Sequence, residues 1–346
     1  MPELPEDLKG QGDIFFRQWN TSHKFVLDME SGRKYSLSDK WEDTSWQLSP
    51  DGKMLVHDEW KKDAAGKEFL LYQLLTAEGQ VLINQLSLKK DEYIAGWWDN
   101  RHLKVSRWIN REIIGLTSLA VMDIFTGQRR EIPANFPGFY RFYPFLLFNP
   151  IIYDPTLTLV VYPRETAAGP VFVLRDIFRK KDLTQISSFP IDAPKWSPEG
   201  KQFVVVGYVD IPKDAGEFFR VTRTGSVTQL THLGTYYNIN RYSWSPDGRY
   251  IALWLGDPQD EQLAIMDMQT LEITSYCIHS QDPDNAPEPI WSPDSRQLVV
   301  QSRDNKNEEH AILVDIEEEI AAEIGKGLGP IFWLRAVPPV WLTETP

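Results

Sequence analysis

A short turn motif recurs along the chain, and it restricts the fold more than any other feature of the sequence. Four segments share an apolar residue, Ser-Pro, an acidic residue, and then Gly or Ser; they begin at Leu48, Trp196, Trp244 and Trp291. Proline fixes φ at the second turn position, Asp suits the next one, and Gly takes the positive φ that closes a hairpin. A basic residue and an apolar run follow each copy. The motif therefore predicts a tight link between two antiparallel strands.

The spacing of the motif indicates a repeat protein. Two weaker copies begin at Trp98 and Ile152, so the series runs 48, 98, 152, 196, 244 and 291, in steps of 44 to 54 residues. Blades of a β-propeller have a similar length, about 40–50 residues. Midway through each unit a second hairpin follows, which in several copies starts at an Asp such as Asp28 or Asp267. Short apolar runs bounded by Gly and polar turns indicate an all-β protein. Residues 317–324 have helical propensity, but their place in the repeat predicts a strand.

Counting the hairpins predicts how the ring closes. The second hairpin occurs seven times and the first hairpin six times, and a spare strand, Ile331 to Leu334, stands near the C-terminus. We therefore expect an all-β, seven-bladed β-propeller of four-stranded antiparallel blades, closed by the C-terminal strand joining the N-terminal blade. Residues 1–346 form one domain in this prediction, with an N-terminal arm over 1–11 and a C-terminal tail over 335–346.

The Trp-Ser-Pro-Asp-Gly hairpin followed by an apolar strand resembles the repeat of TolB-like and WD-repeat-like β-propellers. The resemblance covers nearly the whole chain and is strongest over residues 190–316. It implies the fold and no single activity, because one architecture hosts unrelated functions. TolB itself acts with partners in the periplasm, behind a signal peptide and with an extra domain, and neither is expected here. We expect the rings of Trp196, Trp244 and Trp291 to be buried between adjacent blades.

Composition narrows the classes of partner. The chain has 36 Lys and Arg against 49 Asp and Glu, a net charge of −13, which repels phosphate backbones, so we expect no nucleic-acid partner. No stretch approaches the roughly 20 apolar residues that cross a bilayer, so no membrane association is expected. A single cysteine, Cys277, excludes an internal disulfide. These features predict a cytoplasmic protein, unless a signal peptide has been removed.

Common catalytic signatures are missing from the sequence. It contains no Gly-x-Ser-x-Gly nucleophile elbow and no His-Glu-x-x-His zinc motif, and its six histidines fall in different repeats. The Asp-rich segments 281–285 and 303–306 lack the spaced ligands of a calcium loop and are interpreted as solvated turns. We therefore expect no catalytic residue, no metal and no cofactor.

Two aromatic loops give the functional hypothesis. Residues 136–143 and 235–242 mix Tyr and Phe with Asn and Arg, the composition of recognition surfaces. Loops leading into each blade share one face of a propeller with the loops between second and third strands. The candidate partner-binding residues on that face are Tyr140, Arg141, Tyr143, Tyr236, Tyr237, Arg241, Trp41 and Trp60. The alternative interpretation is that these rings pack the inner rim.

Two functions from different classes remain open. The leading hypothesis is a non-catalytic binding or scaffold propeller that recognises a protein or peptide on its loop face. The alternative is an enzyme or small-molecule binder, of hydrolase or lyase type, with a site in the axial funnel and with residues such as Asp43, Arg141 and Arg241. Ionisable residues from at least three blades meeting in one axial pocket would favour the alternative.

Overall fold

A computed structural model gives the fold of the chain. It describes all residues except 1–3, 19–20, 22, 39–44, 63–65, 67, 90, 109–116, 134–135, 138–150, 168, 188–192, 208–215, 235–237, 258–259, 281–287, 305–307, 339–340 and 345–346. Within the described part, none of the helical segments is long and apolar enough to cross a membrane.

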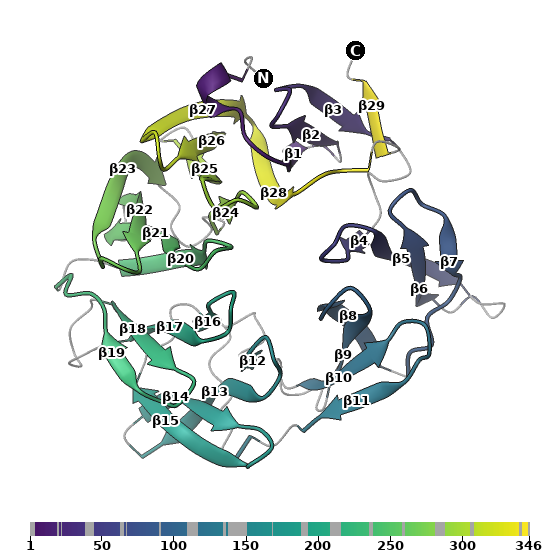
Figure 1. Cartoon of the computed structure of the whole chain (residues 1–346), viewed down its shortest axis with the longest axis vertical. Coiled ribbons are helices and arrows are strands. Elements are labelled where there is room, and N and C mark those ends of the chain that lie inside the picture. The colour runs from purple at the N-terminus through teal and green to yellow at the C-terminus, as the bar shows by residue number, and fades with distance from the viewer. Residues whose placement is uncertain are drawn as a thin grey trace.

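The described strands form sheets arranged as the blades of a β-propeller (Figure 1). A short 3₁₀ helix, Glu6–Leu8, precedes the first strand. Strands β4, β8, β12, β16 and β28 lie nearest the centre of the ring, and later strands of each sheet lie further out (Figure 1). The all-β prediction and the propeller architecture are confirmed.

Four sheets have four antiparallel strands each, in sequence order from the centre outward. The first contains β4 (Ser45–Leu48), β5 (Met54–Lys62), β6 (Glu68–Thr76) and β7 (Val81–Ile83). The second contains β8 (Glu92–Trp97), β9 (His102–Trp108), β10 (Thr117–Asp123) and β11 (Arg129–Ile132). The third contains β12 (Ile152–Tyr153), β13 (Leu159–Thr166), β14 (Gly169–Asp176) and β15 (Lys181–Ser187). The fourth contains β16 (Lys195–Trp196), β17 (Gln202–Gly207), β18 (Glu217–Thr222) and β19 (Val227–Gln229).

A larger sheet follows in the chain. Its eight strands are β20 (Asn238–Trp244), β21 (Tyr250–Asp257), β22 (Asp260–Asp267), β23 (Ile273–Ser280), β24 (Ile290–Trp291), β25 (Gln297–Arg303), β26 (Glu309–Asp315) and β27 (Ile320–Lys326). Ser280 of β23 pairs with Arg303 of β25 in parallel orientation, which joins strands β20–β23 to strands β24–β27. The predicted strand over 317–324 corresponds to β27.

The two ends of the chain meet in one sheet. It contains β1 (Asp13–Gln18), β2 (Lys24–Asp28), β3 (Lys34–Leu37), β28 (Leu328–Leu334) and β29 (Leu342–Glu344), in the order β28-β1-β2-β3-β29. Strand β28 pairs antiparallel with β1, so the C-terminal strand joins the N-terminal sheet at its inner edge as expected. Strand β29 adds to the outer edge by pairing with β3, within the segment that the sequence analysis treats as a tail.

The predicted count of seven separate four-stranded blades is wrong. The described strands form five separate blades, four of four strands and one of five, together with the eight-stranded sheet. Two contacts account for the difference. The Ser280–Arg303 pair links strands expected to be separate, supported by a hydrogen bond from Ser302 Oγ to the His279 carbonyl at 2.5 Å, and β29 adds a fifth strand to the terminal sheet.

The turn motif acts through its serine and its glycine. Ser245 is fully buried; its hydroxyl donates to Asp247 Oδ1 at 2.6 Å and accepts from the Tyr250 N–H at 2.9 Å. Gly248 has φ of 74°, in the left-handed region that disfavours residues with a Cβ. Equivalent Ser–Asp hydrogen bonds occur at 2.8 Å in the turn that starts at Leu48 and at 2.6 Å in the turn that starts at Trp291.

In two of the units, the basic residue after the turn contacts the second hairpin of the same unit. Arg249 contacts the Asp267 carboxylate at 3.1 Å, and Arg296 contacts Asp315 at 2.8 Å. The same Asp side chains accept backbone N–H groups of their own turn, for example Gln269 N–H to Asp267 at 2.7 Å. In these two units the ion pair therefore joins the two hairpins.

The core lies between neighbouring sets of strands. One apolar cluster joins Val204 of β17 to Ile251 of β21, and another joins Val161 of β13 to Phe203 of β17. Of the three tryptophans expected to be buried, Trp291 is buried at 6% exposure. Trp196 and Trp244 are half-buried, and each packs against one of these clusters.

Candidate ligand-binding site

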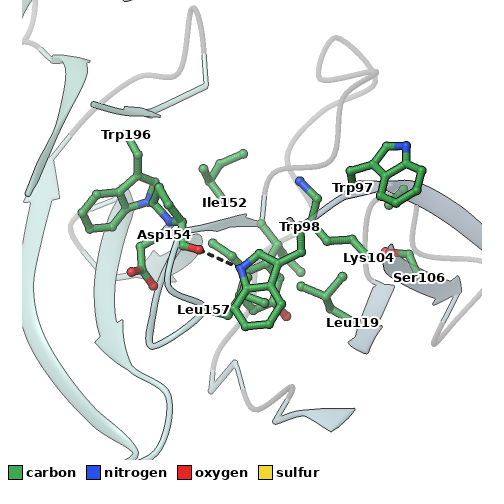
Figure 2. Close-up of a pocket in the computed structure, with 13 residues that line it drawn as sticks. Trp97, Trp98, Lys104, Ser106, Leu119, Ile152, Asp154, Leu157 and Trp196 are labelled. Atoms are coloured by element: carbon green, nitrogen blue, oxygen red, sulfur yellow. Dashed lines mark hydrogen bonds between the residues drawn. The ribbon is translucent and has the colours of Figure 1, made fainter. Parts of the chain in front are cut away.

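A cavity of about 420 Å³ lies between the sheets β8–β11 and β12–β15, with β16 on its third side (Figure 2). Its size falls within the usual range of small-molecule sites, about 300–1,000 Å³. Its walls are formed by Ala95, Trp97, Trp98, Lys104, Ser106, Leu119, Ile151, Ile152, Tyr153, Asp154, Pro155, Leu157 and Trp196. Figure 2 shows Trp196 and Asp154 on one side of this space and Trp97 and Lys104 on the other.

A β-bulge shapes the β8–β9 wall. The register shifts between Ile94, which pairs with Val105, and Gly96, which pairs with Lys104. Ala95 is therefore the extra residue, and bulges of this kind redirect side chains near functional sites. Gly96 has φ of 132°, a conformation that side-chain-bearing residues rarely adopt. Ala95 therefore lies in the cavity wall next to Gly96, the residue that pairs with Lys104.

Hydrogen bonds to other sheets hold two of the tryptophans. Trp97 Nε1–H donates to the Gln47 carbonyl at 2.9 Å, and Trp98 Nε1–H donates to the Pro155 carbonyl at 3.0 Å (Figure 2). The Arg130 guanidinium lies 4.9 Å from the centre of the Trp98 ring, within cation–π distance. Both indoles are thus fixed before any ligand arrives, which lowers the entropic cost of binding.

Asp154 is the acidic residue in the wall, and its negative charge is already paired with Arg223. Its fully buried carboxylate pairs with Arg223 at 2.7 Å and accepts the Leu159 N–H at 2.5 Å, the Thr158 N–H at 2.7 Å and the Thr156 hydroxyl. Burial by itself raises the pKa of Asp154, but these hydrogen bonds outweigh burial and hold the pKa below its ordinary value. Asp154 is therefore a structural anion that fixes one wall.

Lys104 is the basic residue in the wall. No hydrogen bond or ion pair joins its ammonium to any residue that the structure describes. Burial lowers the pKa of Lys104, because a low-dielectric environment disfavours the charged form. The side chain extends past Trp98 into the space between the two walls (Figure 2).

Two further polar groups of cavity-lining residues lack partners. The Tyr153 hydroxyl and the Trp196 Nε1–H are buried with no hydrogen-bond partner in the described structure. Burial raises the pKa of the Tyr153 hydroxyl, so this group stays protonated and can donate. An unpaired buried donor costs about 1–3 kcal/mol. The cavity thus combines aromatic walls with one cation, Lys104, that has no partner among the described residues.

Most of the residues predicted from the loops lie outside the described part of the chain: Tyr140, Arg141, Tyr143, Tyr236, Tyr237 and Trp41, together with Asp43. Trp60, on β5, is 68% exposed. Arg241, on β20, is half-buried with φ of 39° and takes part in an interaction within the protein. Strands β5 and β20 lie on opposite sides of the ring (Figure 1).

The cavity residues were within reach of the sequence analysis but were not selected. Trp98, Tyr153 and Asp154 belong to the two weak copies of the turn motif, and Lys104 lies between the buried Leu103 and Val105. A lysine between two apolar residues of a strand, beside a degenerate repeat, was the available signal. The convergence of three sheets on this lysine could not be derived from spacing alone.

A group of potential metal ligands lies at the β25–β26 turn. Oxygen or nitrogen atoms of Asp304, Glu308 and His310 lie within 4.8 Å of one another. Glu308 already pairs with Lys326 at 2.5 Å, and His310 Nδ1 lies 3.0 Å from Glu323. Glu308 and His310 Nδ1 are therefore already paired within the protein.

A family model provides one comparison. The model of the eukaryotic translation initiation factor eIF2A matches residues 170–306, less than half of the chain. The matched segment contains Trp196 but not the β8–β9 wall of the cavity. No curated protein sequence matches the chain.

Solved structures are similar in fold. A eukaryotic initiation factor is 15% identical, with a TM-score of 0.57, over 95% of this chain and 99% of that chain. An oligogalacturonate lyase from Vibrio parahaemolyticus is 16% identical, with a TM-score of 0.55, over 92% and 87%. TolB from Acinetobacter baumannii is 17% identical, with a TM-score of 0.45, over 93% and 82%. The first two likenesses support the β-propeller fold and, at these identities, nothing finer; one is an enzyme and the other is not described as one.

Proposed function

We propose that the protein is a binding propeller that holds a small ligand, or one residue of a peptide, in the cavity between β8, β12 and β16. The observation that carries this proposal is the coincidence of a 420 Å³ space with walls of Trp97, Trp98 and Trp196. Sites for small ligands are mostly apolar and aromatic, with a few placed polar groups. The cavity matches this pattern in size, lining and rigidity.

The ionisable groups favour binding over catalysis. General acid–base chemistry needs a group that can take or give a proton near neutral pH. Asp154 is committed to Arg223, and Tyr153 is held protonated. The ionisable wall residues that the structure describes come from two sheets. The enzyme alternative requires ionisable residues from at least three blades in one pocket.

Blocking the cavity tests this proposal. Ala95 is exposed at the bulge and lines the cavity, so Ala95→Phe should fill the space without disturbing the core. Binding of 3-phenylpropionate and 3-phenylpropionamide can be followed by saturation-transfer NMR, which detects millimolar affinities. We expect signals with the wild-type protein and their loss in Ala95→Phe. The matched control is Ala321→Phe, at an exposed position of β27. Equal signals from both variants would place the site elsewhere.

A second candidate function, recognition of a protein partner at the loop face, is favoured by Trp60. Trp60 is 68% exposed. Few tryptophans are so exposed, and tryptophan is enriched among the residues that anchor protein interfaces. A net charge of −13 favours a basic or neutral partner over nucleic acid. A partner captured by the wild-type protein should be lost from Trp60→Ala and kept by Phe125→Ala, which removes a ring of 58% exposure on another sheet. Equal capture by both variants would remove Trp60 from the interface.

A further inference from the structure

We propose that the cavity selects ligands that carry one carboxylate on an apolar or aromatic body, with the carboxylate paired to the Lys104 ammonium. This inference rests on the proposed binding function and names its ligand class. It starts from Lys104, a cation with no counterion among the described residues, in a protein that has 13 more acidic than basic side chains. A partly buried charge is costly to leave unpaired, so the site is built to receive an anion.

Three other partly buried cations illustrate how the protein pairs such charges with carboxylates. Arg129 contacts Glu92 at 2.6 Å, Lys195 contacts Glu288 at 2.6 Å, and Arg175 pairs with Asp182. Asp154 cannot serve as the partner of Lys104, because its oxygens accept from Arg223, Thr156 and backbone N–H groups. None of the described residues therefore supplies a counterion to Lys104, and a ligand can supply one.

The unpaired groups in the walls are donors. Lys104 can only donate, and the Trp196 Nε1–H can only donate. The Tyr153 hydroxyl is kept in its donating form, because burial raises its pKa. A ligand that carries a negative charge complements the Lys104 ammonium, whereas an amine or an amidine would add a second cation to the cavity.

The number of charges favours a carboxylate over a phosphate. Lys104 is the one cation among the described residues that line the cavity, and a phosphate monoester carries about −1.5 to −2 at neutral pH. The excess charge would remain buried beside Asp154 without a partner. A carboxylate carries a single charge and matches Lys104 one to one. The three indoles then contact the rest of the ligand, which must be flat or apolar to fit between them.

The carboxylate could belong to a free acid or to the C-terminus of a peptide, and matched probe pairs distinguish these sources. The first pair is 3-phenylpropionate and 3-phenylpropionamide. The second pair is N-acetyl-Gly-Phe with a free C-terminus and the same dipeptide as its amide. Phenyl phosphate is the doubly charged probe. Affinities are measured by calorimetry or NMR titration on the wild-type protein, on Lys104→Met and on Lys104→Arg.

We expect the wild-type protein to bind an acid at least about 30-fold more tightly than its amide. This factor corresponds to the lower end of the affinity loss that follows when one partner of a buried charge pair is removed. Lys104→Met should reduce that ratio to about one, and Lys104→Arg should retain part of it. Lys34→Met is the matched control, because Lys34 is also half-buried but lies on β3, in another sheet; it should leave the ratio unchanged. A preference shown by the phenylpropionate pair assigns the site to a free acid, and one shown only by the peptide pair assigns it to a chain terminus.

Several results would overturn the inference. Equal binding of acid and amide to the wild-type protein would refute the carboxylate preference and leave the binding function intact. A preference that survives in Lys104→Met would assign it to another residue. Tighter binding of phenyl phosphate than of the carboxylate would refute the ligand class. If no probe bound, the proposed function would fail together with the inference. The acid-to-amide affinity ratio of the wild-type protein is measured without any variant. The proposal can therefore be refuted even if a variant fails to fold.

Discussion

Replacing Trp341 by Ala tests how the C-terminal segment closes the ring. Trp341 is fully buried between the terminal sheet and the sheet β4–β7. Its ring centre lies 4.4 Å from that of Trp46, and its Nε1–H donates to the Ala77 carbonyl at 2.9 Å. The side chain therefore ties the segment between β28 and β29 to the neighbouring blade.

The expected loss of unfolding free energy in Trp341→Ala follows from these contacts. Truncating a buried aromatic to Ala costs about 3–5 kcal/mol, and the Ala77 carbonyl loses a donor at a further cost of about 1–3 kcal/mol. Because water can enter near the chain terminus, we expect a total of about 4–6 kcal/mol of unfolding free energy. Unfolding entropy is about 2.1 cal/mol/K per residue, so for 346 residues the melting temperature should fall by about 5–8 °C.

Thermal unfolding followed by circular dichroism measures this shift, with Trp60→Ala as the matched control. Trp60 is 68% exposed, so its removal should change stability by less than about 0.5 kcal/mol. Trp341→Phe keeps a ring but loses the N–H, and it should lie between the two. If Trp341→Ala and Trp60→Ala melted at the same temperature, the packing of the C-terminal segment against β4–β7 would be refuted.

Two carboxylates give further predictions. Burial raises the pKa of Asp13 to about 6 from 3.8, with the Val337 N–H opposing the shift and Asp28 adding to it. The folded state then binds the proton more tightly, so stability should fall by at most about 3 kcal/mol as pH rises from about 4 to about 6. Asp13→Asn should flatten this part of the curve of unfolding free energy against pH, and an unchanged slope would assign it to other groups. Asp154→Ala removes one partner of a buried ion pair and should cost about 3–5 kcal/mol in a urea titration. The double variant Asp154→Ala with Arg223→Met should recover part of that loss, and no recovery would contradict the pairing.

The parts of the fold that depend on local chemistry could be predicted from the sequence. Residues such as Ser245 and Gly248 make their turn through their own hydrogen bonds and φ, so the hairpins could be located from the sequence. Strand β28 was predicted because an apolar run remained after the hairpins were counted.

The parts that depend on neighbouring blades could not be predicted in the same way. The Ser280–Arg303 pair, which merges strands into the eight-stranded sheet, involves two ordinary residues at the ends of strands. Strand β29 is three residues long and is defined by its pairing with β3. The cavity likewise exists because Lys104, Tyr153 and Trp196 come from three sheets, and no one repeat contains its pattern.

A crystal structure of the protein soaked with 3-phenylpropionate tests the central claim most directly. The account predicts the phenyl ring between the indoles of the β8–β12–β16 cavity, with a carboxylate oxygen about 3 Å from Lys104 Nζ. A cavity that stays empty at saturating concentration, or a ligand whose carboxylate faces away from Lys104, would contradict it.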